Sequence, residues 1–281
     1  MIVGFAELLQ ERRGAGGALG AFTCYDLETA HGVLAAAAEL DTGVMLLVSA
    51  ASFAEPAGEQ LIAALLGAAT HSAARACVQL DHVSDLQLIE AAFAAGAGAV
   101  MADGSKLALE DNAALVAQAG RIAGRFGGAV EAELGHVSGD EDVARVAAAG
   151  KFTEPADVGA FLERTGAACL AVSIGNVHGT YASTPMLDWK RLDAIALATD
   201  VPLSLHGASG LPDGDVRRAV GAGIAKVNVN TELREAYLDA TERALADVRD
   251  GEDLLELHRR QSAAAQALTA GKLRLYERET R

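Results

Sequence analysis

Residues 94–100 read AAGAGAV, and residues 220–227 read VGAGIAKV. In both stretches a segment suited to the end of a helix is followed by glycines and then by an apolar run suited to a strand. The same order recurs along the chain, where short runs rich in valine, isoleucine and leucine alternate with longer stretches of helical periodicity. The strands predicted in this way are Ala18–Phe22, Val44–Ser49, Ala76–Leu80, Ala99–Ala102, Ala129–Leu134, Cys169–Ile174, Pro202–Leu205 and Ile224–Val229.

This alternation predicts an α/β fold, a (β/α)₈ TIM barrel, because strand–helix–strand units give parallel strands with right-handed crossovers. The chain has 281 residues, close to the ~250 of such a barrel. No Pro/Gly/Ser-rich linker divides the chain, so residues 1–281 are predicted to form one barrel domain. The chain from Thr231 to about Glu277 has a helical pattern, and residues from about 232 to 281 are predicted to form C-terminal helices. Asp85 and Pro155 suit the first turns of two of the barrel helices.

The composition excludes several kinds of partner. A formal net charge of −15 argues against a nucleic-acid or anionic-membrane partner. The longest apolar runs have the length of strands, far below the ~20 residues of a membrane span. Cys24, Cys77 and Cys169 have no metal-ligand spacing, which favours buried, reduced thiols in a cytoplasmic protein.

Polar residues gather just after the predicted strands. His82, His178 and His206 each follow a different strand, and the carboxyl ends of barrel strands converge on one mouth. Three imidazoles that leave a further position open are a ligand set typical of catalytic zinc. His31, His71 and His258 fall within predicted helices and fit ordinary structural positions, whereas the position of His136, on a loop near the site, leaves its role open.

Two glycine-containing stretches, HGT at 178–180 and HGASG at 206–210, suggest a separate binding role. Glycine lets backbone N–H groups approach a ligand closely, and the loops after the last barrel strands often bind phosphate. Ser209 and Thr231 could add hydroxyl donors. Together with the metal set, these stretches predict a phosphorylated substrate.

Six ordered stretches resemble the motifs of class II, zinc-dependent ketose-bisphosphate aldolases, which include the fructose- and tagatose-bisphosphate enzymes. The resemblance runs from about Ala21 to Tyr237. The stretches are QLDHVSD, VMADGSKLALEDN, VEAELGHVSGDEDV, VSIGNVHGTY, PLSLHGASGLP and IAKVNVNTELREAY.

The resemblance implies a reversible aldol cleavage that gives or uses dihydroxyacetone phosphate, and it assigns roles to matching residues. Asp81 and Glu141 would be the catalytic proton carriers, at the aldehyde-derived hydroxyl and at the ketone-side carbon. The residues expected at the metal are His82, His178 and His206 as zinc ligands, with Glu133 and Asp103 beside them as supporting or alternate ligands. The residues expected at the substrate are Asn228 for the enediolate and Gly179, Gly207, Ala208, Ser209, Asn230 and Thr231 for the phosphate end.

The same resemblance implies cofactors and partners. The cofactor would be Zn²⁺, and a monovalent cation, Na⁺ or K⁺, could bind main-chain carbonyls around Val177, Gly179 and Gly207. A homodimer or homotetramer is expected. Ser49 is a candidate on the acceptor side, with an ordinary strand-end serine as its alternative.

Several departures leave the substrate open. Ala182 and Ser183 occupy positions where relatives usually carry a phosphate-binding lysine, and AFTCYD has no asparagine after its phenylalanine. Asn230 stands where fructose enzymes often have aspartate and the tagatose type alanine. The arginine for a distal phosphate has three candidates, Arg274, Arg278 and Arg281.

The departures allow a specialised pathway aldolase with a different acceptor or donor. A metal-dependent hydrolase on the same barrel is disfavoured because the first strand has no histidine. A non-catalytic relative is disfavoured because the proton-transfer residues are present.

Overall fold

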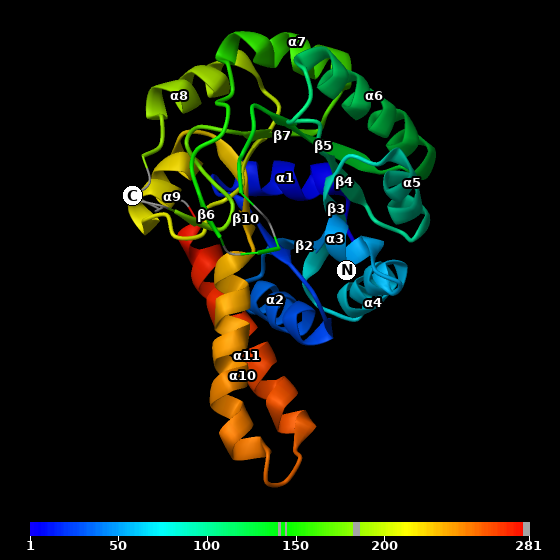
Figure 1. The fold of residues 1–281 in the computed structure, drawn as a ribbon, viewed down its shortest axis with the longest axis vertical. Coiled ribbons are helices and arrows are strands. Elements are labelled where there is room, and N and C mark those ends of the chain that lie inside the picture. Colours follow the sequence, from blue (N-terminus) through cyan, green and yellow to red (C-terminus); the bar gives the residue numbers. More distant parts are fainter. Residues whose placement is uncertain (140–141, 144, 182–185, 278–281) are drawn as a thin grey trace.

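The structure of the chain, a computed structural model, describes residues 1–139, 142–143, 145–181 and 186–277. Eight parallel strands form a closed barrel in the order β1-β10-β9-β7-β5-β4-β3-β2, so the predicted (β/α)₈ barrel is confirmed (Figure 1). The pairing of β1 with both β2 and β10 closes it. The barrel strands are β1 Leu19–Thr23, β2 Gly43–Ser49, β3 Arg75–Val83, β4 Ala99–Ala102, β5 Ala129–Leu134, β7 Cys169–Val172, β9 Leu203–Leu205 and β10 Ile224–Val229.

Helices cover the outside of the barrel. Their ends are fixed by local chemistry: Asp85 accepts from the Gln87 amide at 2.7 Å at the start of α5, and Pro155 is the first residue of α7. The helices that connect the barrel strands are α2 Leu27–Glu39, α4 Gly58–Thr70, α5 Leu86–Ala94, α6 Leu109–Phe126, α7 Pro155–Thr165, α8 Trp189–Ala198 and α9 Asp213–Gly221.

Several short elements were not predicted from the sequence. Helix α1, Phe5–Gly14, closes the amino-terminal end of the barrel, where Phe5, Leu8 and Leu9 pack in one apolar cluster with Leu19 and Met45. Helix α3, Ala50–Ala54, follows β2 directly. A two-stranded sheet joins β6, Val146–Ala147, to β8, Thr180–Tyr181.

The C-terminal part consists of helices, as predicted, and the structure divides it into two. Helix α10, Thr231–Val248, and helix α11, Leu254–Leu275, form a hairpin that projects from the barrel (Figure 1). The chain turns between them because Glu252 has a φ of 52° and Asp253 caps α11 by accepting from the Glu256 amide at 2.9 Å.

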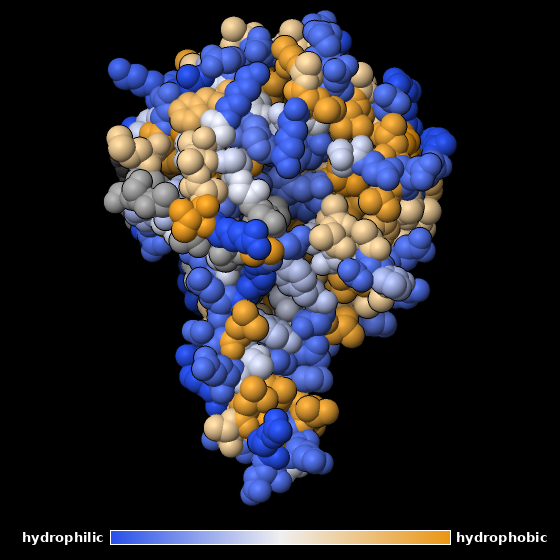
Figure 2. All heavy atoms as spheres, viewed as in Figure 1, coloured by the Kyte–Doolittle hydropathy of each residue, from blue (hydrophilic) through white to orange (hydrophobic). Residues whose placement is uncertain are grey.

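Helix α11 packs closely on α2. A Cβ atom at Gly32 would lie 2.5 Å from the carbonyl oxygen of Ser262, so only glycine permits this approach. The Ser262 hydroxyl also donates to the Glu28 carbonyl at 2.9 Å. Figure 2 shows apolar side chains gathered on the projecting hairpin, where the exposed leucines are Leu238, Leu245, Leu254 and Leu255.

The cysteines are buried, and none of them forms a disulfide. Burial raises the pKa of the Cys77 thiol to about 12 and raises that of the Cys24 and Cys169 thiols as well. These thiols therefore stay protonated and act as small apolar groups. Among the described residues, no helix has the length and apolar character needed to cross a membrane.

Candidate active site

Three histidines meet at the mouth of the barrel, as predicted. His82 comes from β3, His178 from the loop after β7, and His206 follows β9 directly. One ligand nitrogen of each lies within 4.8 Å of the others, and Nε2 of His82 is 2.8 Å from Nδ1 of His206. The ring of His82 meets the other two edge to face, with centroids 4.8 Å apart. The three imidazoles therefore point at a common centre.

An irregular backbone aims His82 at this centre. Its φ of 52° lies in the left-handed region, which non-glycine residues seldom adopt. The pairing of β3 with β4 shifts register between Leu80 and Val83, which marks a bulge or another irregularity around His82. Bulges redirect side chains near functional sites, and strain of this kind is retained where the surrounding structure enforces it.

Asn176 ties together the two loops that carry the other histidines. Its side-chain amide donates to the carbonyl of His206 at 2.9 Å, and its Oδ1 accepts from the Ile174 amide at 2.8 Å. The backbone amide of His178 donates to the Ser138 carbonyl at 2.8 Å. Asn176 is fully buried, so it holds the backbone that presents the ligands.

Carboxylates orient two of the imidazole rings. Nδ1 of His82 lies 2.9 Å from Asp103 Oδ2, and Nε2 of His206 lies 2.9 Å from Glu131 Oε1. A ring nitrogen that donates to a carboxylate leaves the other nitrogen with its lone pair free for a metal. Burial alone would raise the pKa of Asp103, but the hydrogen bonds from His82 and Ser105 hold that pKa below its ordinary value. Asp103 is thus an ionised partner for His82.

Glu133 lies beside this centre. It is fully buried, and its Oε1 accepts from the Val137 amide at 2.7 Å. Its Oε2 has no hydrogen-bond partner among the described residues. Donor atoms of His82, Asp103 and Glu133 also lie within 4.8 Å of one another, which makes a second ligand set that shares His82. His136, which the sequence left open, lies 3.0 Å from the Ser105 hydroxyl through its Nδ1.

Asp81 and Asn228 face each other across the barrel mouth. The amide Nδ2 of Asn228 donates to Asp81 Oδ2 at 3.0 Å and lies 3.3 Å from Nδ1 of His206. Ser49 is paired in register with Asp81, but its Oγ caps α3 by accepting from the Ser52 amide at 3.2 Å. The structure thus supplies a structural role for Ser49, next to the carboxylate.

A small cavity beside the histidines brings together the predicted phosphate-binding residues. Gly207 has a φ of 61°, and a Cβ atom there would lie 2.1 Å from the carbonyl oxygen of Val177. Thr231 is the first residue of α10, so the positive end of this helix dipole faces the cavity. Ala208 is buried in the turn between Gly207 and Ser209. The lining residues are His178, Gly179, Gly207, Ser209, Asn228, Asn230 and Thr231.

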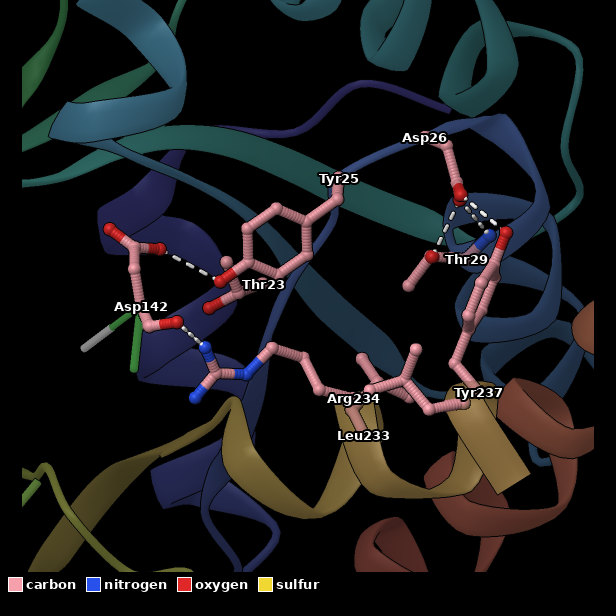
Figure 3. Close-up of a pocket in the computed structure, with 9 residues that line it drawn as sticks. Thr23, Tyr25, Asp26, Thr29, Asp142, Leu233, Arg234 and Tyr237 are labelled. Atoms are coloured by element: carbon pink, nitrogen blue, oxygen red, sulfur yellow. Dashed lines mark hydrogen bonds between the residues drawn. The ribbon is translucent and has the colours of Figure 1, made fainter. Parts of the chain in front are cut away.

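A second, larger cavity of about 240 Å³ adjoins this one, between the starts of α2 and α10 (Figure 3). The Tyr25 hydroxyl lies 2.8 Å from Asp142 Oδ1 and 3.2 Å from Asn230 Oδ1, so it links the two cavities. Arg234 donates to the Asp142 carbonyl, and its Nη2 is buried with no partner among the described residues. Opposite, Tyr237 donates to Asp26 Oδ2 at 2.6 Å.

Tyr25 and Arg234 were not predicted from the sequence as site residues. The signals were an aromatic residue just after the first strand and an arginine in the first turn after the last strand. Arg234 brings a cation to this side of the mouth, and it was not among the arginines that the sequence suggested for a distal phosphate.

A layer of polar side chains below the histidines was also missed. Each of these side chains belongs to a residue two positions before a site residue on the same strand. Because side chains on a strand alternate between its two faces, these side chains point into the barrel as the site residues do. All are buried, and Glu131 is at their centre. They are Gln79, Glu131, Ser204 and Lys226.

Some predicted residues are not at the site or lie outside the described residues. Arg274 pairs with Glu39 at 3.3 Å at the end of α2, the end of the barrel opposite the mouth, so this chain does not bring it to its own site. Glu141, Ala182, Ser183, Arg278 and Arg281 lie outside the described residues.

Comparisons with known proteins identify the family of the chain. The sequence profile of the family described as Fructose-bisphosphate aldolase class-II matches residues 3–281. The YdjI aldolase from Escherichia coli K12 is 28% identical, with a TM-score of 0.84 over 98% of this chain and 97% of that one. A putative fructose-1,6-bisphosphate aldolase from Coccidioides immitis is 27% identical, with a TM-score of 0.89 over 97% and 95%.

A fructose-bisphosphate aldolase from Campylobacter jejuni, at 20% identity, shares the fold with a TM-score of 0.79 over 98% of this chain and 95% of that one. The family match covers almost the whole chain, and the aldolase structures superpose over almost its full length. The chain therefore belongs to the class-II fructose-bisphosphate aldolase family and is an enzyme of the aldolase type, a carbon–carbon lyase.

Proposed function

We propose that the chain is a zinc-dependent aldolase that reversibly cleaves a phosphorylated ketose into dihydroxyacetone phosphate and an aldehyde. The observation that carries this proposal is the convergence of His82, His178 and His206 beside Asp81, with two of the rings oriented by carboxylates. Family membership supports the same reaction class.

The three histidines fit zinc. Imidazole nitrogens are preferred zinc ligands, and three protein ligands leave a position for substrate. When bound, zinc would act as a Lewis acid toward the substrate carbonyl and stabilise the negative charge that cleavage leaves on carbon. Glu133, with its unpartnered oxygen, would support the ion or offer it an alternate ligand.

The protein would move two protons. In cleavage, Asp81 takes the proton from the hydroxyl on the aldehyde side of the breaking bond, and that carbon becomes the aldehyde carbonyl. The electron pair of the carbon–carbon bond stays on the ketone-side carbon, which Glu141 then protonates. Asn228 would donate its amide to an oxygen of the enediolate. Condensation reverses each step. The part assigned to Glu141 rests on the family resemblance.

Backbone and hydroxyl donors would hold the phosphate. The residues Gly179, Gly207, Ser209, Asn230 and Thr231 line one cavity at the start of α10, and Ala208 lies in the turn between Gly207 and Ser209. Donors of this kind bind phosphate without a lysine. A monovalent cation, Na⁺ or K⁺, at the carbonyls of Val177, Gly179 and Gly207 belongs to the same proposal; the Gly207 carbonyl also accepts from the Tyr181 hydroxyl at 2.8 Å.

The acceptor aldehyde is the open part of the proposal. Thr23 ends β1 where asparagine is common, and it lines the second cavity with Tyr25 and Arg234. These residues favour a specialised aldolase with an acceptor other than that of fructose or tagatose bisphosphate. A high turnover with fructose bisphosphate would reject this specialisation and leave the aldolase assignment intact.

The deciding experiment is an aldol assay of the purified protein with zinc. Cleavage of fructose and tagatose bisphosphates, and condensation of dihydroxyacetone phosphate with a panel of aldehydes, would be measured before and after chelator treatment. We expect chelation to abolish activity and added zinc to restore it. His178→Ala should lose zinc and activity together. Chelator-treated protein with full activity would refute the zinc mechanism.

We also propose a homodimer or homotetramer in the cytoplasm. The exposed leucines of the α10–α11 hairpin, such as Leu238 and Leu254, offer an apolar contact surface. The buried cysteines without disulfides suit a reducing compartment. Light scattering after size-exclusion chromatography would determine the number of subunits.

A further inference from the structure

Lys226 lies inside the barrel and is fully buried. Its ammonium is 2.8 Å from Glu131 Oε2 and 2.6 Å from Asn228 Oδ1. Burial alone would lower its pKa, but the charges of Glu131 and Asp81 raise that pKa above its ordinary value. Lys226 is therefore a cation and not a free amine, so it is not suited to form a Schiff base with a ketose.

The ammonium fixes which way the Asn228 amide points. A lysine ammonium only donates hydrogen bonds, so the Asn228 atom beside it must be the oxygen. Nδ2 then faces Asp81 Oδ2 at 3.0 Å and the metal ligand His206. A flipped amide would place NH₂ against the ammonium and an oxygen against the carboxylate. Lys226 and Asp81 therefore hold the amide with its donor toward the site.

The same ammonium supports the orientation of His206 through Glu131. Oε2 of Glu131 accepts from Lys226 and from Gln79, both at 2.8 Å. Oε1 accepts from the Ser204 hydroxyl and faces His206 Nε2 at 2.9 Å. A buried carboxylate needs such compensation. With Glu131 held in this way, His206 directs Nδ1 toward the other histidines.

We propose that Lys226 is a positioning residue that acts on two site residues at once. Directly, it holds the Asn228 amide with Nδ2 toward the reacting atoms; through Glu131, it holds His206 with Nδ1 toward the metal. The identity of the reacting atoms rests on the proposed aldolase function. The contacts that orient Asn228 and His206 do not depend on it.

The first test compares Lys226→Met with wild type for zinc affinity, thermal unfolding, kcat and KM. Loss of a group that supports a metal ligand typically weakens metal binding about 10- to 100-fold, and we expect a loss of this size. At saturating zinc we expect kcat to fall at least tenfold with a smaller change in KM. Unchanged zinc affinity and kcat would overturn the proposal.

Arg12→Met is the matched control. Arg12 is also a buried cation, paired with Glu277 at 2.7 Å, but it belongs to α1 at the closed end of the barrel. We expect it to lower the unfolding temperature and to leave zinc affinity and kcat unchanged. A loss of zinc affinity in this variant equal to that of Lys226→Met would show a general effect of losing a buried cation.

A double-mutant cycle tests the link to Asn228. If Lys226 acts through that amide, Lys226→Met should reduce kcat far less in an Asn228→Ala background than in wild type. Additive losses at saturating zinc would reject this part of the proposal. The cycle separates positioning from a loss of stability, because a general destabilisation would affect both backgrounds equally.

If Lys226→Met fails to fold, the double variant Glu131→Gln with Lys226→Met takes its place. This variant removes both buried charges, and such replacements are often tolerated. We expect it to fold, with kcat still low because the Asn228 amide is no longer held. Wild-type kcat and zinc affinity would show that Lys226 only balances Glu131, and would overturn the proposal. Absence of aldol activity in zinc-loaded wild type would refute the proposed function, whereas the zinc affinities would still test the positioning of His206.

Discussion

The amide of Asn228 donates to the carboxylate of Asp81 across the barrel mouth at 3.0 Å. This contact joins β10 to β3 and holds a carboxylate that is only 2% exposed beside the three histidines. Asp81, which is proposed to carry the proton, is thus oriented by Asn228, which is proposed to contact the developing negative charge.

Asp81→Asn tests this arrangement. The variant keeps the shape of the side chain but removes its ability to take a proton, so kcat should fall by about a hundred- to ten-thousand-fold. Zinc content should stay at the wild-type level, because Asp81 is not a proposed zinc ligand. Steady-state cleavage rates and metal analysis would check both. Asp85→Asn, which alters a carboxylate that caps α5, should keep full activity; wild-type turnover in Asp81→Asn would exclude the proton-transfer role.

Asp103→Ala should weaken zinc binding without removing a proposed histidine ligand. Asp103 accepts from Nδ1 of His82 at 2.9 Å, and loss of such a partner typically lowers metal affinity about 10- to 100-fold. A chelator competition titration would measure the change. Most of the activity should return at saturating zinc, in contrast to His178→Ala. An unchanged zinc affinity would show that the carboxylate does not orient His82.

Gly32→Ala should loosen the packing of α11 on α2. The added methyl group would lie 2.5 Å from the Ser262 carbonyl, and overpacking of this kind costs about 1–3 kcal/mol. Gly67→Ala is the control, because a Cβ atom on that helical glycine meets nothing within 4 Å. It should be neutral or stabilise by about 0.5–1 kcal/mol. Chemical denaturation of both variants would measure the difference; equal midpoints would contradict the close packing.

Alkaline pH should destabilise the fold in part through Cys77. Burial raises the pKa of its thiol from an ordinary 9.0 to about 12, although the charge of Lys226 acts in the opposite direction. The unfolded chain therefore releases this proton at a lower pH than the folded chain does. The contribution of this thiol to the free energy of unfolding is fully present below about pH 9. It is lost as the pH rises toward about 12, by at most ~1.4 kcal/mol per pH unit.

Cys77→Ala measures this contribution. Its free energy of unfolding should be lower at neutral pH because of the smaller side chain, but should decline less steeply than wild type between pH 9 and 12. Parallel declines in the two proteins would show that the thiol does not take part.

The sequence predicted the barrel and the residues at its mouth because both depend on local and repeated signals. Strand–helix alternation gave the topology, and polar residues at strand ends gave His82, His178 and His206. The same pattern did not reveal the turn at Glu252, because the segment between α10 and α11 contains only one glycine and no proline to interrupt the helical pattern.

Side-chain pairs inside the barrel could not be predicted from the sequence. The contact between Lys226 and Glu131 joins residues on strands that are not neighbours in the barrel, and a polar residue inside a strand gives no sign of its partner. The cavity at Tyr25 and Arg234 likewise depends on how β1 and α10 meet. These contacts follow from closure of the barrel, which periodicity implies but does not place residue by residue.

The left-handed backbone at His82 has a consequence for protein engineering. A ligand on a regular strand would have its side chain aimed by the alternation of the pleat alone, whereas His82 has a φ of 52° within a register shift between Leu80 and Val83. Three histidines transplanted onto the strand ends of another TIM barrel would therefore not reproduce this ligand geometry by themselves. The graft would also need the irregular segment around His82 and a carboxylate equivalent to Asp103, so the transferable unit is a piece of backbone together with its side chains.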